Sequence, residues 1–145
     1  MRRKQARAEA MQLVYEQACR PDETPSEVFD RAMELRQIEP DPYMRELFFG
    51  VCGNLTEIDA VISRYSNGWR NDRISSVAMA VMRVAVYEIR FRDDVPGSVA
   101  VNEAIELIKE YDDAGKLRKF VNGVLNAVMK DGAEDGSSAG AAEHE

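Results

Sequence analysis

Four positive charges and no negative charge lie in the first seven residues, at Arg2, Arg3, Lys4 and Arg7. Lysine and arginine side chains bind phosphates, and the arginine guanidinium also stacks on unpaired bases. The same run also fits an N-terminus whose charges only keep the protein in solution. The pattern therefore indicates either a nucleic-acid contact or a solvated arm, and on either interpretation we expect these side chains to lie open to solvent.

A second basic cluster, Lys116, Arg118 and Lys119, opens the last helix that the sequence predicts. Backbone N–H groups at the start of a helix attract anions, and Lys116 and Lys119 would strengthen that effect. A joint nucleic-acid site requires this cluster to lie close to the N-terminal run.

Three further residues of this helix bear on such a site. Phe120 either belongs to the core or offers its ring edge to a base, and Asn122 is expected to point outward. Gly123 lowers helix stability by roughly 1 kcal/mol relative to alanine. It indicates either a tight helix crossing or the close approach of another backbone or an RNA strand.

Tyr15 lies two turns after Arg7 on the side of the helix that carries the basic residues. Its ring would stack on a base at the edge of the N-terminal run. The alternative is a half-buried core tyrosine whose hydroxyl is hydrogen-bonded.

The common catalytic and metal-binding patterns are missing from the sequence. His144 is the one histidine, and Cys19 and Cys52 form no CxxC pair, so a structural zinc site is excluded. No glycine-rich phosphate loop is present. Glu103 has no histidine or second placed carboxylate beside it, and we interpret it as structural. We expect no enzyme activity, no metal and no cofactor, and we interpret the cysteines as buried thiols.

The 145 residues suffice for one globular domain, with 45% hydrophobic and 31% charged residues. No apolar run approaches a membrane span or follows the basic start as a signal core, so we expect a cytoplasmic protein. The net charge of −7 is uneven, because residues 131–145 hold five acidic residues and no lysine or arginine. That segment also lacks large apolar side chains, which predicts a folded domain over 1–130 and a disordered acidic tail over 131–145.

Helical periodicity runs through the whole of residues 1–130, and no alternating segment of strand length competes with it. The expected helices cover residues 3–19, a segment from 25 up to the break at 39–42, a single long helix over 42–66, and then 76–90, 99–111 and 116–130. Their starts are marked by a capping box at Thr24-Pro25-Ser26-Glu27, by Asp41-Pro42, and by Ser75 or Ser76. The prediction is an all-α compact bundle of six or seven helices, counting a possible turn at 69–73, in two packed subdomains divided near residue 67.

Three segments resemble the NusB family of bacterial transcription antitermination factors. They are RRKQAR at residues 2–7 followed by AMQLVY at 10–15, MRVAVYEI at 82–89, and VPGSVAVNEAIELIK at 95–109 followed by KFVNGVL at 119–125. The pair NEAIELIK and KFVNGVL is specific, because chance rarely supplies both at this separation. The resemblance extends over about residues 1–130 and implies an all-helical RNA-binding protein that is not an enzyme.

The resemblance implies binding of boxA RNA from ribosomal-RNA leader transcripts. It implies NusE, which is also a small-subunit ribosomal protein, as partner, within an assembly that keeps RNA polymerase from terminating early. The RNA-binding residues would be Arg2, Arg3, Lys4, Arg7, Tyr15, Lys116, Lys119, Phe120 and Asn122. The face with Arg83, Tyr87 and Glu88 would hold NusE. The resemblance is compatible with a monomer and with a homodimer. The alternative function is a helical protein–protein adaptor that does not bind RNA directly.

Overall fold

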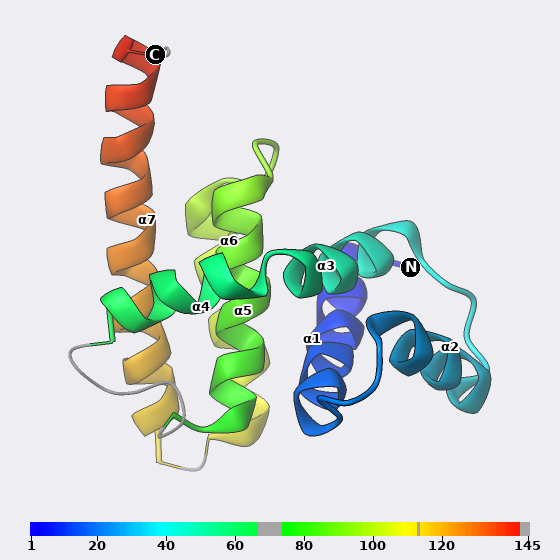
Figure 1. Ribbon diagram of the computed structural model, residues 1–145. Coiled ribbons are helices and arrows are strands. Elements are labelled where there is room, and N and C mark those ends of the chain that lie inside the picture. Colours follow the sequence, from blue (N-terminus) through cyan, green and yellow to red (C-terminus); the bar gives the residue numbers. More distant parts are fainter. Residues whose placement is uncertain (67–73, 113, 143–145) are drawn as a thin grey trace.

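The computed structural model describes residues 1–66, 74–112 and 114–142, with side chains up to residue 131. Within these ranges the chain forms seven α-helices and one 3-10 helix and contains no strand, which confirms the all-α prediction (Figure 1). The elements are α1 (Arg3–Cys19), α2 (Pro25–Arg36), α3 (Pro42–Gly53), α4 (Leu55–Arg64), α5 (Ser76–Phe91), α6 (Gly97–Ile108), η2 (Lys109–Tyr111) and α7 (Lys116–Ala142). The expected connector at 69–73 lies outside the described residues.

Helices α2, α3 and α5 begin at the residues that the sequence predicts. In the capping box of α2, the Glu27 N–H donates to Thr24 Oγ1 at 3.2 Å, and the Thr24 N–H donates to Glu27 Oε1 at 2.8 Å. At the start of α3, Asp41 Oδ2 accepts from two backbone N–H groups at 3.0 Å. Ser75 caps α5. These local signals are confirmed because each satisfies N–H groups that a first helical turn leaves unpaired.

The single long helix predicted over residues 42–66 is wrong, because the chain breaks at Asn54 into α3 and α4. Asn54 leaves the helical conformation, with φ −126° and ψ 25°, and its Nδ2 donates to the Gly50 carbonyl at 2.8 Å. A side chain that bonds the preceding turn in this way competes with helix continuation. The apolar stripe carries on through the break, since Val51 of α3 and Ile58 of α4 are both buried.

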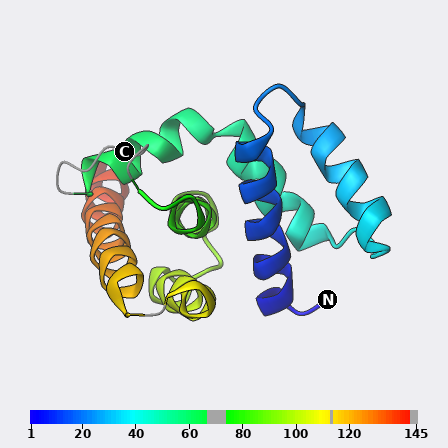
Figure 2. The same ribbon diagram turned by 90° about the horizontal axis from the view of Figure 1, so that it is seen from below.

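Helix α5 is the centre of the molecule, and Figure 2 shows it nearly end-on between the other helices. It packs against α1, α3, α4, α6 and α7. Its buried residues accordingly lie all around the helix, from Ala78 to Glu88, rather than on one stripe. A helix surrounded in this way offers little surface to any partner.

The helices form two packed groups, α1–α3 and α4–α7, as Figures 1 and 2 show. The predicted division near residue 67 is displaced, because α4 packs on α5 and α7 and belongs to the second group. The boundary is therefore the break at Asn54. The two groups share one core, since α1 and α3 both pack on α5.

Helix α7 continues to Ala142, twelve residues past Lys130, where the sequence predicts that the folded part ends. Residues 131–142 continue this helix, and in Figure 1 they project beyond the rest of the bundle. The domain boundary at residue 130 stays a prediction. The packed first half of α7 already supplies the helix nucleus, so each further residue only has to propagate the helix. Among the described side chains of α7, the last buried one is Val128.

No described helix combines the length and the apolar character that a membrane crossing requires.

Candidate nucleic-acid interface

Arg2 and Lys4 are exposed cations at the start of α1. Neither forms an ion pair within 4.0 Å of a described carboxylate, and both line a groove of about 560 Å³ between α1 and the α6–η2 segment. The opposite wall includes Glu106 and Lys109, which form an ion pair at 2.8 Å. The hydrogen bond from Lys109 lowers the pKa of Glu106, and the nearby Lys4 charge lowers it further. The groove therefore combines both signs of charge, with Arg2 and Lys4 free to bind an anion.

Arg3 is held over the protein surface rather than extended into solvent. Its guanidinium carbon lies 4.2 Å from the centre of the Tyr43 ring, and Nη2 lies 3.4 Å from Asp94 Oδ2. The side chain is still about half exposed. A phosphate can reach it, in competition with the Asp94 carboxylate.

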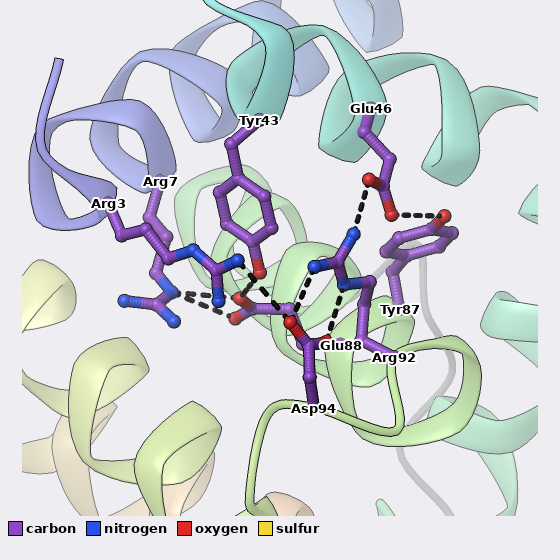
Figure 3. A network of polar contacts seen from close by, with 8 residues as sticks. All are labelled: Arg3, Arg7, Tyr43, Glu46, Tyr87, Glu88, Arg92 and Asp94. Carbon is purple, nitrogen blue, oxygen red and sulfur yellow. Dashed lines mark hydrogen bonds and ion pairs between the residues drawn. The ribbon is translucent and has the colours of Figure 1, made fainter.

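Arg7 is buried, so the expectation that it lies open to solvent is wrong. It is 6% exposed, and its Nε donates to both carboxylate oxygens of Glu88, at 3.0 and 2.9 Å (Figure 3). It follows Ala6 on the inward edge of α1, which packs on α5, so its side chain enters the core. Nη1 also lies 3.9 Å from Glu103 Oε1, consistent with the structural role expected for that carboxylate.

The Arg7–Glu88 pair belongs to a polar network that joins α1, α3 and α5 (Figure 3). The Tyr43 hydroxyl of α3 donates to Glu88. Burial is the main reason that the pKa of Tyr43 lies well above its usual value, and the hydrogen bond to Glu88 raises it further. Arg92, just after α5, bridges Glu46 of α3 and Asp94. Tyr43, Glu46, Arg92 and Asp94 were missed by sequence reasoning, since no local pattern reports pairs 41 to 91 residues apart.

The predicted partner face of Arg83, Tyr87 and Glu88 does not form an exposed surface. Glu88 is 1% exposed and fully engaged by Arg7 and Tyr43, so its assignment to a surface contact is wrong. Tyr87 is also buried and donates to Glu46 Oε2 at 3.2 Å. Arg83 is bound by Asp59 of α4 through two bonds of 2.8 and 2.9 Å. The cause is the central position of α5, which the sequence pattern does not reveal.

The start of α7 keeps its exposed lysines but has no open anion site. Lys116 and Lys119 are exposed, and neither forms an ion pair with a described acidic residue. The backbone N–H groups of Leu117 and Arg118, however, donate to the Asp112 carboxylate at 3.2 and 2.9 Å. The expected attraction of an external anion by these groups is therefore wrong, since an internal carboxylate already occupies the helix end.

The middle of α7 decides the sequence alternative at Gly123 and shows the surroundings of Phe120 and Asn122. A Cβ atom added at Gly123 would meet nothing within 4 Å, so the tight helix crossing is wrong. Phe120 is half-buried and packs on the core, and a contact of its ring edge with a base stays a prediction. Asn122 is exposed, and its Oδ1 accepts from Asn126 Nδ2 at 2.8 Å. The approach of an RNA strand at Asn122 and Gly123 stays a prediction.

The N-terminal run and the start of α7 do not meet directly, contrary to the expected close juxtaposition. Helix α6 lies between the N-terminal end of α1 and the first turns of α7 (Figure 2). Arg2 and Lys4 instead face the α6–η2 segment across their groove. The two basic clusters are therefore separate parts of the surface.

Tyr15 lies at the surface, 37% exposed, and its hydroxyl makes no hydrogen bond to a described residue. The alternative of a half-buried tyrosine with a satisfied hydroxyl is therefore wrong. Base stacking by Tyr15 stays a prediction.

The described residues include no group of histidine, cysteine and acidic side chains arranged to hold a metal ion. Both cysteines are free. Cys19, at the end of α1, is exposed, which corrects the expected burial. Cys52 is half-buried, and burial raises the pKa of its thiol to about 11, so this thiol stays protonated and unreactive at neutral pH.

Comparison with known proteins gives a consistent result. The family model described as "NusB family" matches residues 4–130. The transcription antitermination protein NusB of Listeria monocytogenes serotype 4b is 41% identical over 126 residues, which cover 86% of this chain and 94% of the relative.

Solved structures agree. A structure of T. maritima NusB has a TM-score of 0.80 and 31% identity, covering 90% of this chain and 92% of the other. A crystal structure of the antitermination factors NusB and NusE in complex with dsRNA has a TM-score of 0.77 and 32% identity, covering 89% and 96%. The fold, the family model and the relatives all agree over the packed part of the bundle, and the chain belongs to the NusB family.

Proposed function

We propose that this protein is a transcription antitermination factor that binds single-stranded, boxA-type RNA of ribosomal-RNA leader transcripts together with NusE. In this role it joins the assembly that keeps RNA polymerase from terminating early, in the cytoplasm. The function is equilibrium binding and includes no catalytic step. The single observation that carries the proposal is the likeness over nearly the whole chain to a NusB crystallised with NusE and RNA.

The distribution of free cations supports RNA binding by an overall acidic chain. Arg2 and Lys4 beside α6, and Lys116 and Lys119 on α7, are exposed and lack carboxylate partners among the described residues. Phosphate contacts act locally, within a Debye length of roughly 8 Å, so the net charge of −7 does not prevent them. If all four contact phosphates, log affinity falls against log salt with a slope of about −3.

A gel-shift titration with boxA-type RNA and a scrambled control, each with and without NusE, tests the proposal. We expect the boxA-type RNA to bind more tightly, and NusE to strengthen its binding. The double variant Arg2→Ala, Lys4→Ala should weaken both RNAs and lower the salt slope by about 1.4, or roughly 0.7 per phosphate.

A matched control removes two exposed positive charges elsewhere. The double variant Arg20→Ala, Arg31→Ala has the same net charge as the test variant, but both its arginines lie beside Glu23 near α2. It should bind RNA with a nearly unchanged salt slope. NusE binding without any RNA binding would contradict the proposal and favour the adaptor alternative.

A further inference from the structure

A second hollow, of about 370 Å³, lies further along α1. From α1 it is lined by Met11, Gln12, Tyr15 and Glu16, and its other walls are Val77 of α5 and Tyr111 of η2. Tyr111 belongs to none of the sequence motifs described above. Its side chain is 43% exposed and makes no hydrogen bond or ring contact to a described residue.

This hollow continues the groove that Arg2 and Lys4 line. On α1, Lys4 and Ala8 line the first hollow, and Gln12 and Tyr15 line the second. Steps of four, four and three residues keep these positions on one helix face. On the opposite wall, Glu110 lines the first hollow and the next residue, Tyr111, lines the second. The two hollows therefore follow one another along the same face of α1, and we call them together the α1–η2 furrow.

The two ends of the α1–η2 furrow differ in chemistry. One end carries the cations Arg2, Lys4 and Lys109 together with the carboxylates of Glu103, Glu106 and Glu110, and the other carries two exposed tyrosine rings, Tyr15 and Tyr111. Of the cations, Arg2 and Lys4 have no ion-pair partner among the described residues. Unpaired cations beside aromatic rings are an arrangement with which proteins bind single-stranded nucleic acid, with phosphates at the cations and bases on the rings. From Lys4 to Tyr15 the helix rises about 16 Å, the length of about five stacked nucleotides.

We propose that Tyr111 stacks, together with Tyr15, on an unpaired base of an RNA strand that lies along the α1–η2 furrow. This inference rests on the proposed function and adds a base-binding residue to it. The stacking depends on the ring and not on the hydroxyl, because the hydroxyl has no hydrogen-bond partner among the described residues.

The test compares Tyr111→Leu, which removes the ring, with Tyr111→Phe, which keeps it. Binding is measured with boxA-type RNAs that carry the fluorescent base 2-aminopurine at successive positions. With wild-type protein, we expect the fluorescence of one position to change on binding. Tyr111→Leu should abolish that change and weaken binding about tenfold, while Tyr111→Phe should stay within about twofold of wild type. Because no charge is removed, the salt slope should not change for either variant.

Phe91→Leu is the matched control. Phe91 is similarly exposed, but it ends α5 whereas Val77 lies near the start of that helix, about 21 Å away along the axis. This variant should bind RNA like wild type, and thermal melts should show that all three variants are folded.

The outcomes separate this inference from the proposed function. A wild-type protein that binds no RNA contradicts the proposed function itself. RNA binding that is equally tight in wild type and Tyr111→Leu, with the same fluorescence change, overturns the stacking role alone. Loss of NusE binding by Tyr111→Leu without loss of RNA affinity would also overturn it, since the furrow would then hold a protein.

Discussion

Arg7 of α1 and Glu88 of α5 form a buried ion pair across the boundary between the two helix groups, with Nε within 3.0 Å of both carboxylate oxygens. Arg7 lies only three residues after Lys4, which faces the groove. The pair therefore fixes the rotation of α1 about its axis. That rotation decides which basic side chains face the furrow and which face the core.

Removing one partner of this pair should strongly destabilise the fold. In Glu88→Gln the Arg7 guanidinium stays buried without an opposite charge, which typically lowers the free energy of unfolding by about 3–5 kcal/mol. Urea unfolding followed by circular dichroism measures the change. The matched control is Glu106→Gln, which breaks the exposed pair with Lys109 and should change stability by less than about 1 kcal/mol. Similar small effects in both variants would show that the buried pair contributes little.

Gly50 is required by the close approach of Tyr87. A Cβ atom at this position would lie 2.3 Å from Tyr87 Cε1, so the buried ring would have to move. Gly50→Ala should therefore lower the free energy of unfolding by about 1–3 kcal/mol. Gly123→Ala adds the same methyl group to an open helix face and should raise stability by up to about 1 kcal/mol. Thermal melts of the two variants measure this difference in stability. Equal stability of the two variants would show that the Tyr87 ring moves aside without cost.

Asp94 limits the availability of Arg3 to RNA. Hydrogen bonds from Arg92, and then from Arg3, lower the pKa of the Asp94 carboxyl, so it is ionised at neutral pH. Asp94→Asn should release Arg3 and raise RNA affinity on the order of 2- to 5-fold, the range expected for an exposed ion pair.

The control for this prediction is the neighbouring residue. Asp93→Asn removes the same charge from an exposed carboxylate that forms no ion pair with a described residue. It should raise the affinity less than Asp94→Asn. Equal gains in filter-binding assays would mean that only the net charge matters.

What the sequence could predict is the local part of this structure. The capping box at Thr24 and Glu27 and the cap at Asp41 depend on residues two or three positions apart, so a pattern reveals them. The break at Asn54 was missed because the apolar stripe continues through it, and the signal is one asparagine bond to the turn before.

The sequence predicts which cations belong to the candidate site, but it does not predict their burial or their ion-pair partners. Arg2 and Lys4 are exposed as expected. Arg3 and Arg7 are both arginines of the same run, but Arg3 is exposed and Arg7 is buried. Only its partner on α5, 81 residues away, explains its burial. The carboxylate of Asp112 likewise occupies the start of α7, because it accepts from backbone N–H groups five and six residues further along the chain.

Acid should weaken the start of α2 through Glu27. The hydrogen bond from the Thr24 backbone N–H, and then that from the Thr24 side chain, lower the pKa of Glu27 below its ordinary 4.5. The unfolded chain therefore binds more protons at this group than the folded chain does, so stability rises with pH across this range. The contribution is complete above the ordinary pKa and is lost as pH falls through the lower, folded pKa, starting at about pH 5.

Glu27→Gln tests this directly, because the amide oxygen can still accept the Thr24 N–H bond but does not titrate. Thermal melts between neutral pH and about pH 3 should show a flatter decline of Tm for Glu27→Gln than for wild type. Asp30→Asn, which removes an exposed carboxylate of the same helix without an ion pair to a described residue, serves as the control and should follow the wild-type curve more closely. Parallel curves for wild type and Glu27→Gln would show that the capping carboxylate does not carry the acid sensitivity of α2.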